Sequence, residues 1–208
     1  MDFTFVSGNL GLDLVGTVGR RRGERVDLLA TPQDLARWTV TAGLLDVPPA
    51  VSDDDLALTA RLREAIYRLA SAARTGSAYE EADRRLLNQA AQHAPAGVLL
   101  GDGGLERSGD LRSALSSTAR AAAELLGGPH AALIRECEAT PCTRLYIDTS
   151  HRRTRRWCDM RGCGNRAKAA AFGPAPSSTE PHPAALNDGA AGQRRSRTIA
   201  PCRMPDAR

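Results

Sequence analysis

The stretch Cys137–Cys163, CEATPCTRLYIDTSHRRTRRWCDMRGC, decides the predicted fold of the C-terminal part of the chain. It holds four of the five cysteines among 208 residues, in the spacing C-x4-C-x15-C-x4-C. Four thiolates fill the tetrahedral shell that structural Zn²⁺ prefers, at zinc–sulfur distances of ~2.3 Å. Pro141 and the glycines on either side of Cys163 supply turn residues, so each pair of sulfurs can reach one ion. We therefore expect one structural zinc ion per chain, bound by Cys137, Cys142, Cys158 and Cys163.

Two other interpretations of these cysteines remain open. Reduced thiols could pack a small core without a metal, or one thiol could carry redox or catalytic chemistry. No arrangement of His or Asn near a cysteine supports a nucleophile, and the four histidines are scattered at positions 93, 130, 151 and 182. The first 18 residues lack the features of a secretory signal, and no apolar run approaches the ~18 residues of a membrane span. We expect a cytoplasmic protein with reduced thiols, in which Cys202 is an unpaired bystander.

Positive charge is concentrated around the cysteines. Residues 1–136 carry 15 Lys and Arg against 18 Asp and Glu, whereas residues 137–175 carry 8 against 3. A zinc–tetrathiolate centre has a charge of about −2, which leaves a surplus of about +3 in the second segment. An anionic polymer is the partner that such a surplus favours. We expect contacts with DNA phosphates from Arg152, Arg153, Arg155, Arg156, Arg161, Arg166 and Lys168.

Several of these side chains have a structural alternative. The four arginines between positions 152 and 156 could form a solvated loop, with one of them paired to Asp148 or Asp159. Asn165 and Arg166 could contact base edges if the following helix enters a groove. Alternatively, Asn165 caps that helix and Arg166 braces the zinc loop. We prefer the cap for Asn165 and leave Arg166 undecided.

The zinc-binding segment is expected to contain a hairpin and a helix. We predict that Leu145–Asp148 and Arg155–Cys158 are extended and flank a polar turn, and that a helix follows Cys163. Tyr146 and Trp157 are expected in the core of the finger rather than as platforms for base stacking. Asp148, followed by Thr149 and Ser150, favours an Asx-type turn.

Helical signals dominate the rest of the chain. The sequence is 42% hydrophobic but only 4% aromatic, and Ala and Leu favour helices over strands. Thr31 with Pro32 and Asp34 marks one helix start, and Ser52 before three aspartates marks another. The expected helices cover about residues 10–18, 32–42, 53–69, 79–93 and 110–127, and GVLLGDGGLERSGDL (97–111) favours a β-hairpin.

The predicted fold class is therefore mainly α with a small β-hairpin, followed by a treble-clef-like or ribbon-like zinc finger. We expect a helical domain over residues 1–130, the finger over 131–173 and a disordered tail over 174–208, where large apolar residues are few. Asp13 lies among apolar neighbours; a helix cap is the preferred role and a ligand contact the alternative. No paired carboxylates or nucleophile–base set can be recognised, so an enzyme is not expected.

Several segments of the sequence also resemble those of a known protein family. The segment CTRLYIDTSHRRTRRWCDMRGCGNRAK resembles the CGNR-type zinc finger, whose name is spelled by residues 163–166. The segments GLDLVGTV, DLLATPQDLARWTVTAGLL and LREAIYRLA resemble the ABATE domain of bacterial stress-induced transcription regulators. The chain departs from that pattern at Gly16, where the family usually has Asn, and in AAAFGPAPSS, where the family often continues as a short basic helix.

The resemblance implies a bacterial DNA-binding transcription regulator in the stress response. In that interpretation the finger binds DNA, and the helical domain senses a signal or forms a homodimer. The small-molecule effector is not identified, and no membrane partner is expected. The alternative is a protein-interaction or RNA-binding module in which zinc only stabilises the finger, without sequence-specific DNA binding.

Overall fold

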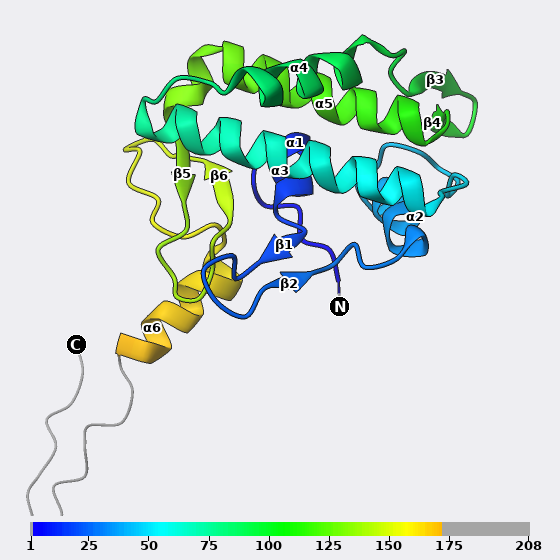
Figure 1. Cartoon of the computed structure of the whole chain (residues 1–208). Coiled ribbons are helices and arrows are strands. Elements are labelled where there is room, and N and C mark those ends of the chain that lie inside the picture. Colours follow the sequence, from blue (N-terminus) through cyan, green and yellow to red (C-terminus); the bar gives the residue numbers. More distant parts are fainter. Residues whose placement is uncertain (1, 172–208) are drawn as a thin grey trace, which may run out of the picture. The chain divides into compact units, whose positions relative to one another are not determined.

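Helices are the main regular elements of the computed structural model, which describes residues 2–171 (Figure 1). The predicted disordered tail, 174–208, lies outside the described residues. The helices are α1 (Leu10–Val15), α2 (Pro32–Thr41), α3 (Asp53–Thr75), α4 (Glu81–Gln92), α5 (Leu111–Gly127) and α6 (Asn165–Ala171). A 3₁₀ turn, Pro129–Leu133, follows α5, and a π turn, Met160–Gly164, leads into α6.

Three antiparallel two-stranded hairpins accompany the helices within the described residues. They pair β1 (Val18–Gly19) with β2 (Val26–Asp27), β3 (Gly97–Gly101) with β4 (Gly104–Ser108), and β5 (Ile134–Glu136) with β6 (Leu145–Ile147). The β3–β4 hairpin lies where GVLLGDGGLERSGDL predicts one. The prediction of a mainly helical chain with a small hairpin and a cysteine-bearing C-terminal element is confirmed.

Local capping explains where the longer helices begin. Reciprocal side-chain and main-chain hydrogen bonds join Thr31 to Asp34, Ser52 to Asp55 and Asp110 to Ser113, at the starts of α2, α3 and α5. Each box satisfies amide groups that have no partner inside the helix. The prediction that Asp13 is a cap is wrong, because Asn9 caps α1. The Asp13 carboxylate is buried and accepts a hydrogen bond from the amide of Ser7 at 3.0 Å.

The main core lies where α3 packs against α1, α4 and α5. Leu12, Leu14 and Val15 of α1 are fully buried there, as is Trp38 of α2. The approach of α1 to α5 is close, since a Cβ at Gly11 would come within 2.6 Å of the Ala122 Cβ. No helix among residues 2–171 is long and apolar enough to cross a membrane.

Strand β6 connects this core to the cysteine-bearing segment. Leu145 and Ile147 point into the main core, whereas Tyr146 belongs to a second buried cluster that contains the cysteines. Successive side chains of a strand point to opposite faces, so one short strand serves both cores. The amide of Ile147 also donates to the carbonyl of Ser7 at 2.9 Å, which attaches the N-terminal segment to the same strand.

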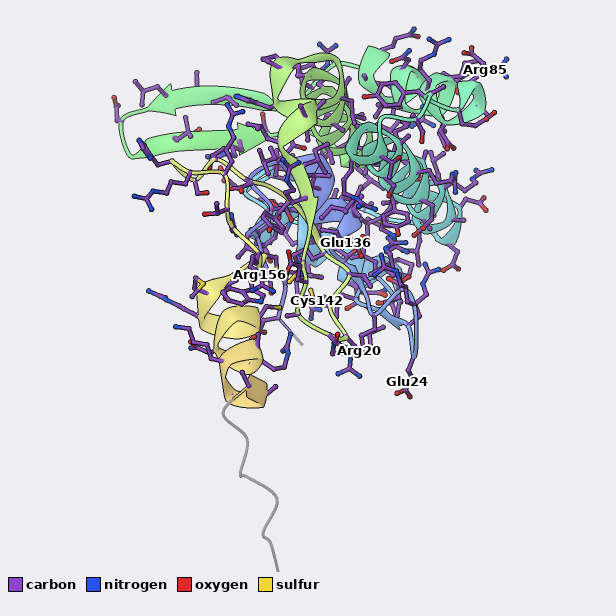
Figure 2. The ribbon with its side chains drawn as sticks, turned by 90° about the vertical axis from the view of Figure 1, so that its left-hand side faces the viewer. Arg20, Glu24, Arg85, Glu136, Cys142 and Arg156 are labelled. Atoms are coloured by element: carbon purple, nitrogen blue, oxygen red, sulfur yellow. The ribbon has the colours of Figure 1, made fainter. Side chains whose placement is uncertain are left out.

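Salt bridges reinforce the same junction. Glu136 on β5 forms ion pairs with Arg22 and with Arg74 of α3, the latter at 3.5 Å. In Figure 2 Glu136 lies above Cys142, on the side away from α6. Arg21 contributes its amide, which donates to the Thr143 hydroxyl at 3.1 Å. The cysteine segment is therefore packed on the helices, and the described residues belong to one compact unit.

The predicted hairpin between 145–148 and 155–158 is wrong. Strand β6 pairs with β5, in the register Ile134 with Ile147, and residues 155–158 form no strand. Side chains of β6 and of the turn after it, rather than hydrogen bonds between two strands, hold the segment 155–158 in place. The Tyr146 hydroxyl donates to the carbonyl of Arg155 at 2.5 Å, and the Arg155 amide donates to the Asp148 carboxylate at 3.0 Å.

Candidate metal centre

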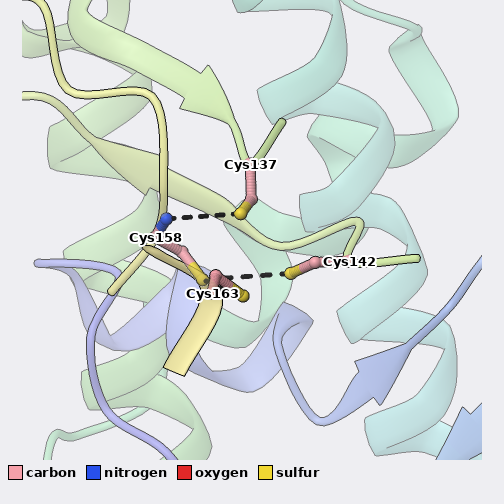
Figure 3. Close-up of side chains that lie close together, drawn as sticks. All are labelled: Cys137, Cys142, Cys158 and Cys163. Atoms are coloured by element: carbon pink, nitrogen blue, oxygen red, sulfur yellow. Dashed lines mark hydrogen bonds between the residues drawn. The ribbon is translucent and has the colours of Figure 1, made fainter. Parts of the chain in front are cut away.

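Four cysteine sulfurs converge at the loop end of the β5–β6 hairpin (Figure 3). The Sγ atoms of Cys137, Cys142, Cys158 and Cys163 all lie within 4.8 Å of one another. The Sγ atom of Cys158 lies 3.9 Å from that of Cys142 and 3.6 Å from that of Cys163. A tetrahedron with ~2.3 Å zinc–sulfur bonds has sulfur–sulfur edges of about 3.8 Å. The cluster is consistent with one zinc ion.

Each sulfur is positioned by a short local turn. Cys137 directly follows β5, and the Cys142 amide closes a turn on the carbonyl of Ala139 at 2.6 Å. Cys163 lies in the π turn before α6, where the Asp159 side chain accepts from the amide of Gly162 at 2.7 Å. The cysteines therefore come from two loops, as the spacing C-x4-C-x15-C-x4-C predicts.

Hydrogen bonds among the thiols distribute their protons unequally. Bonds from Cys142 and Cys158 lower the pKa of Cys137, and the bond with Cys137 raises the pKa of Cys142 to about 11. The Cys158 amide also donates to the Cys137 sulfur at 3.4 Å. One thiolate is thus favoured at the expense of its neighbours. Holding four thiolates together requires a cation in their midst, and Zn²⁺ supplies that charge.

A small apolar cluster surrounds the sulfurs. Tyr146 is fully buried within it, and Trp157, Val6 and Ala167 pack around it while partly exposed. The prediction that Tyr146 and Trp157 belong to the finger's core is confirmed. The contribution of Val6 could not be found from the sequence, because Val6 lies 131 positions before Cys137 in a segment without any regular pattern.

Arg155 is turned inward, toward the finger. Its guanidinium donates to the carbonyl of Trp157 at 2.8 Å, to that of Val6 at 3.3 Å, and also to that of Cys158. The same group lies 4.5 Å from the centre of the Tyr146 ring. All of these contacts hold the loop before Cys158 against β6 and the N-terminal segment.

Arg156 and Arg166 also have partners within the protein. Arg156 forms a 2.6 Å ion pair with Glu138 and lies over the Trp157 ring. Arg166 donates to the Sγ atom of Cys163 at 3.0 Å, which is the bracing role weighed for it above. The cap assigned to Asn165 is wrong, because Asp159 occupies the capping position and the Asn165 amide donates to the carbonyl of Arg161 at 3.0 Å.

Four other cations of this segment lie at the surface. Arg152, Arg153, Arg161 and Lys168 are exposed, and none of them has an ion pair within the part of the chain that the structure describes. The turn that presents the first two is fixed by Asp148, whose carboxylate accepts from the amide of Ser150 at 3.0 Å. This bond confirms the Asx-type turn. Burial favours a higher pKa for Asp148, but hydrogen bonds from Ser150 and Arg155 outweigh it and lower the pKa.

Comparison with known families assigns both parts of the chain. Residues 134–173, which contain all four clustered cysteines, match the CGNR zinc finger. Residues 8–129 match ABATE, a family described as "putative stress-induced transcription regulator". The chain belongs to the ABATE family. Neither description names a catalytic activity, and no curated protein matches the chain.

Within the ABATE part, the absence of a side chain at Gly16 leaves space for Arg144. A Cβ at this position would collide with the guanidinium of Arg144, whose Nη1 donates to the carbonyl of Thr4 at 3.0 Å. The arginine from the CGNR finger therefore occupies the space that a side chain at position 16 would need.

Proposed function

We propose that this protein is a cytoplasmic, DNA-binding transcription regulator whose CGNR finger contacts the phosphate backbone of duplex DNA. The observation that carries the proposal is the set of exposed cations on the cysteine-bearing segment that have no ion-pair partner among residues 2–171. Cations of this kind are available for phosphate oxygens without first breaking an ion pair. The family description supports the regulatory role.

The contacts of the seven cations suggest different roles among them. Arg152, Arg153, Arg161 and Lys168 are proposed as the main phosphate ligands because they are exposed and form no ion pair with another described residue. Arg156 shares its charge with Glu138 and would contribute less. Figure 2 shows Arg156 beside the start of α6, the helix to which Lys168 belongs. Arg155 and Arg166 are proposed to support the finger, since each is already bound within it.

The experiment measures DNA binding by the zinc-loaded full chain over a salt series. Neutralising Arg152, Arg153, Arg161 and Lys168 together with Gln should lower affinity strongly at low salt. Each lost phosphate contact should also reduce the slope of log K against log salt by about 0.9. Arg61→Gln removes an exposed charge elsewhere, Arg107→Gln removes a partly exposed one, and both serve as controls. Absence of binding at low salt, or equal weakening by the controls, contradicts the proposal.

A second candidate function is a protein-interaction or RNA-binding module stabilised by zinc. The observation that favours it lies on the β3–β4 hairpin, where Val98, Leu99 and Leu100 are 66%, 63% and 82% exposed. Contiguous exposed apolar side chains are typical of protein contact sites, including homodimer interfaces. Competition between duplex DNA and structured RNA, with the oligomeric state measured in parallel, separates this candidate from the first.

A further inference from the structure

A cavity of about 220 Å³ lies among α3, α4 and α5, away from the cysteines. Its apolar wall is formed by Leu58 and Leu62 of α3, Leu86 and Ala90 of α4, and Leu115 of α5. A cavity of about 150 Å³ is enough to hold benzene. The space therefore suits one substituted aromatic ring or a short acyl chain.

Three polar side chains complete the lining: Gln89 and His93 from α4 and the residue after it, and Arg112 from α5. None of the three side chains has a hydrogen bond or ion pair to another described residue, and no Asp or Glu lines the cavity. An apolar pocket with a few convergent polar groups is the usual form of a small-molecule site.

The charge of Arg112 is available to a ligand. Asp55 and Asp110 are near enough for Arg112 to lower their pKa values, but the hydrogen bonds of their own capping boxes are the larger causes. Asp55 is bound by Ser52, and Asp110 is bound by Ser113. Neither carboxylate comes within ion-pair distance of Arg112. The planar guanidinium can therefore bind a carboxylate through two parallel hydrogen bonds.

We propose that this cavity binds a small amphipathic carboxylate, with the apolar body between the three helices and the carboxylate on Arg112. One guanidinium beside two further hydrogen-bonding side chains, Gln89 and His93, matches a singly charged carboxylate. A more strongly hydrated dianion would lose more solvation on entering a mostly apolar space. The inference gives a ligand to the helical domain, for which the family resemblance implies a sensing role, and rests on the proposed function only for its regulatory consequence.

Calorimetric titration of the zinc-loaded full chain tests the proposal, with benzoate and octanoate as probes. Benzamide and octanamide are matched neutral probes, and at least one carboxylate should bind about tenfold or more tightly than its amide, a difference of about 1.4 kcal/mol. Arg112→Gln should weaken that carboxylate by a similar factor, whereas Arg61→Gln should leave its affinity unchanged. Absence of saturable binding by both carboxylates, or unchanged affinity in Arg112→Gln, overturns the proposal.

A second variant tests the location. Ala90→Leu fills the cavity and should abolish binding, whereas Ala82→Leu makes the same change at an exposed position of α4 and should not. Circular dichroism and the melting temperature verify that both variants fold; if Ala90→Leu does not, Arg112→Gln and the amide probes still decide. Retained binding in folded Ala90→Leu refutes the assigned cavity. Failure of the chain to bind DNA would refute the proposed function and leave these ligand titrations intact.

Discussion

The hydroxyl of Tyr146 donates to the main-chain carbonyl of Arg155 at 2.5 Å, while the Arg155 guanidinium lies 4.5 Å from the centre of the same tyrosine ring. The two residues thereby bind each other through main chain and side chain together. Because Tyr146 lies on β6 and Arg155 lies three positions before Cys158, this pair fixes the approach of the second cysteine pair to the first.

Arg155→Gln should therefore destabilise the finger. The change leaves the carbonyls of Val6 and Trp157 without their donor, and loss of a partly buried hydrogen-bond partner costs about 1–3 kcal/mol. We expect zinc to transfer to a chromophoric chelator faster than from wild type. Arg152→Gln, which removes the same charge from an exposed side chain, is the control and should release zinc at the wild-type rate. Equal release from both variants would show that the inward position of Arg155 contributes nothing.

Local signals explain which elements could be predicted from the sequence. A capping box needs only residues three positions apart, so Thr31 with Asp34 and Ser52 with Asp55 mark α2 and α3 correctly. The cysteine cluster could be predicted from the sequence equally well, because the residue type and the spacing of the four cysteines indicate a shared metal ion. The four-cysteine cluster, which is consistent with one zinc ion, follows from that chemistry.

The missed features depend on contacts between distant segments. Leu145–Ile147 is buried on both faces, so its sequence lacks the alternation that would reveal its partner or its orientation. Its neighbours, β5 and the segment around Ser7, are selected by the packing of the whole helical part. The inward position of Arg155 has the same origin, since its acceptors include the carbonyl of Val6. A run of arginines reveals charge but does not distinguish bound from free guanidinium groups.

Removal of zinc should affect the two cores differently. The cysteine cluster and Tyr146 form one core, whereas Leu62, Ile66 and Trp38 belong to the other. Chelation should therefore increase protease cleavage between residues 137 and 163 while most of the helical circular dichroism remains.

Purified protein should hold close to one zinc per chain. Each clustered cysteine changed to Ser should lower that content, whereas Cys202→Ser should not; full zinc content in a Cys158→Ser variant would exclude it as a ligand.

Acid should destabilise the β1–β2 hairpin and its attachment to α3. Burial favours higher pKa values for Asp27 and Glu64, but hydrogen bonds and charges from Arg63 and Arg21 outweigh it, and both pKa values are lowered. Arg63 binds both carboxylate oxygens of Asp27, at 2.8 and 2.6 Å, and is itself buried. A lowered carboxyl pKa stabilises the fold above the unfolded-state value near 4 and loses that effect as the pH falls.

Urea unfolding between about pH 6 and pH 3 checks this expectation, and the free energy of unfolding should fall as the pH decreases. Asp27→Asn should cost about 1–2 kcal/mol at neutral pH, a modest value because the carboxylate is one-third exposed and solvent screens it. The variant should also show a shallower pH dependence. Asp102→Asn, in the exposed β3–β4 turn, is the control and should follow the wild-type profile. An unchanged profile in Asp27→Asn would assign the acid sensitivity to other groups.

The close approach of α1 to α5 predicts a strong effect of one methyl group. A Cβ at Gly11 would lie 2.6 Å from the Cβ and 3.2 Å from the Cα of Ala122, so the helices must separate to accept Gly11→Ala. Overpacking of this kind costs about 1–3 kcal/mol.

Gly127→Ala is the control. It adds the same methyl group at the end of α5, where nothing lies within 4 Å, and should be neutral or stabilising by up to ~1 kcal/mol. Ala122→Gly should recover part of the loss in a Gly11→Ala background, because it removes the atom that collides. Thermal unfolding of the four variants measures this coupling, and strict additivity of Gly11→Ala and Ala122→Gly would contradict direct contact between the two helices at this point.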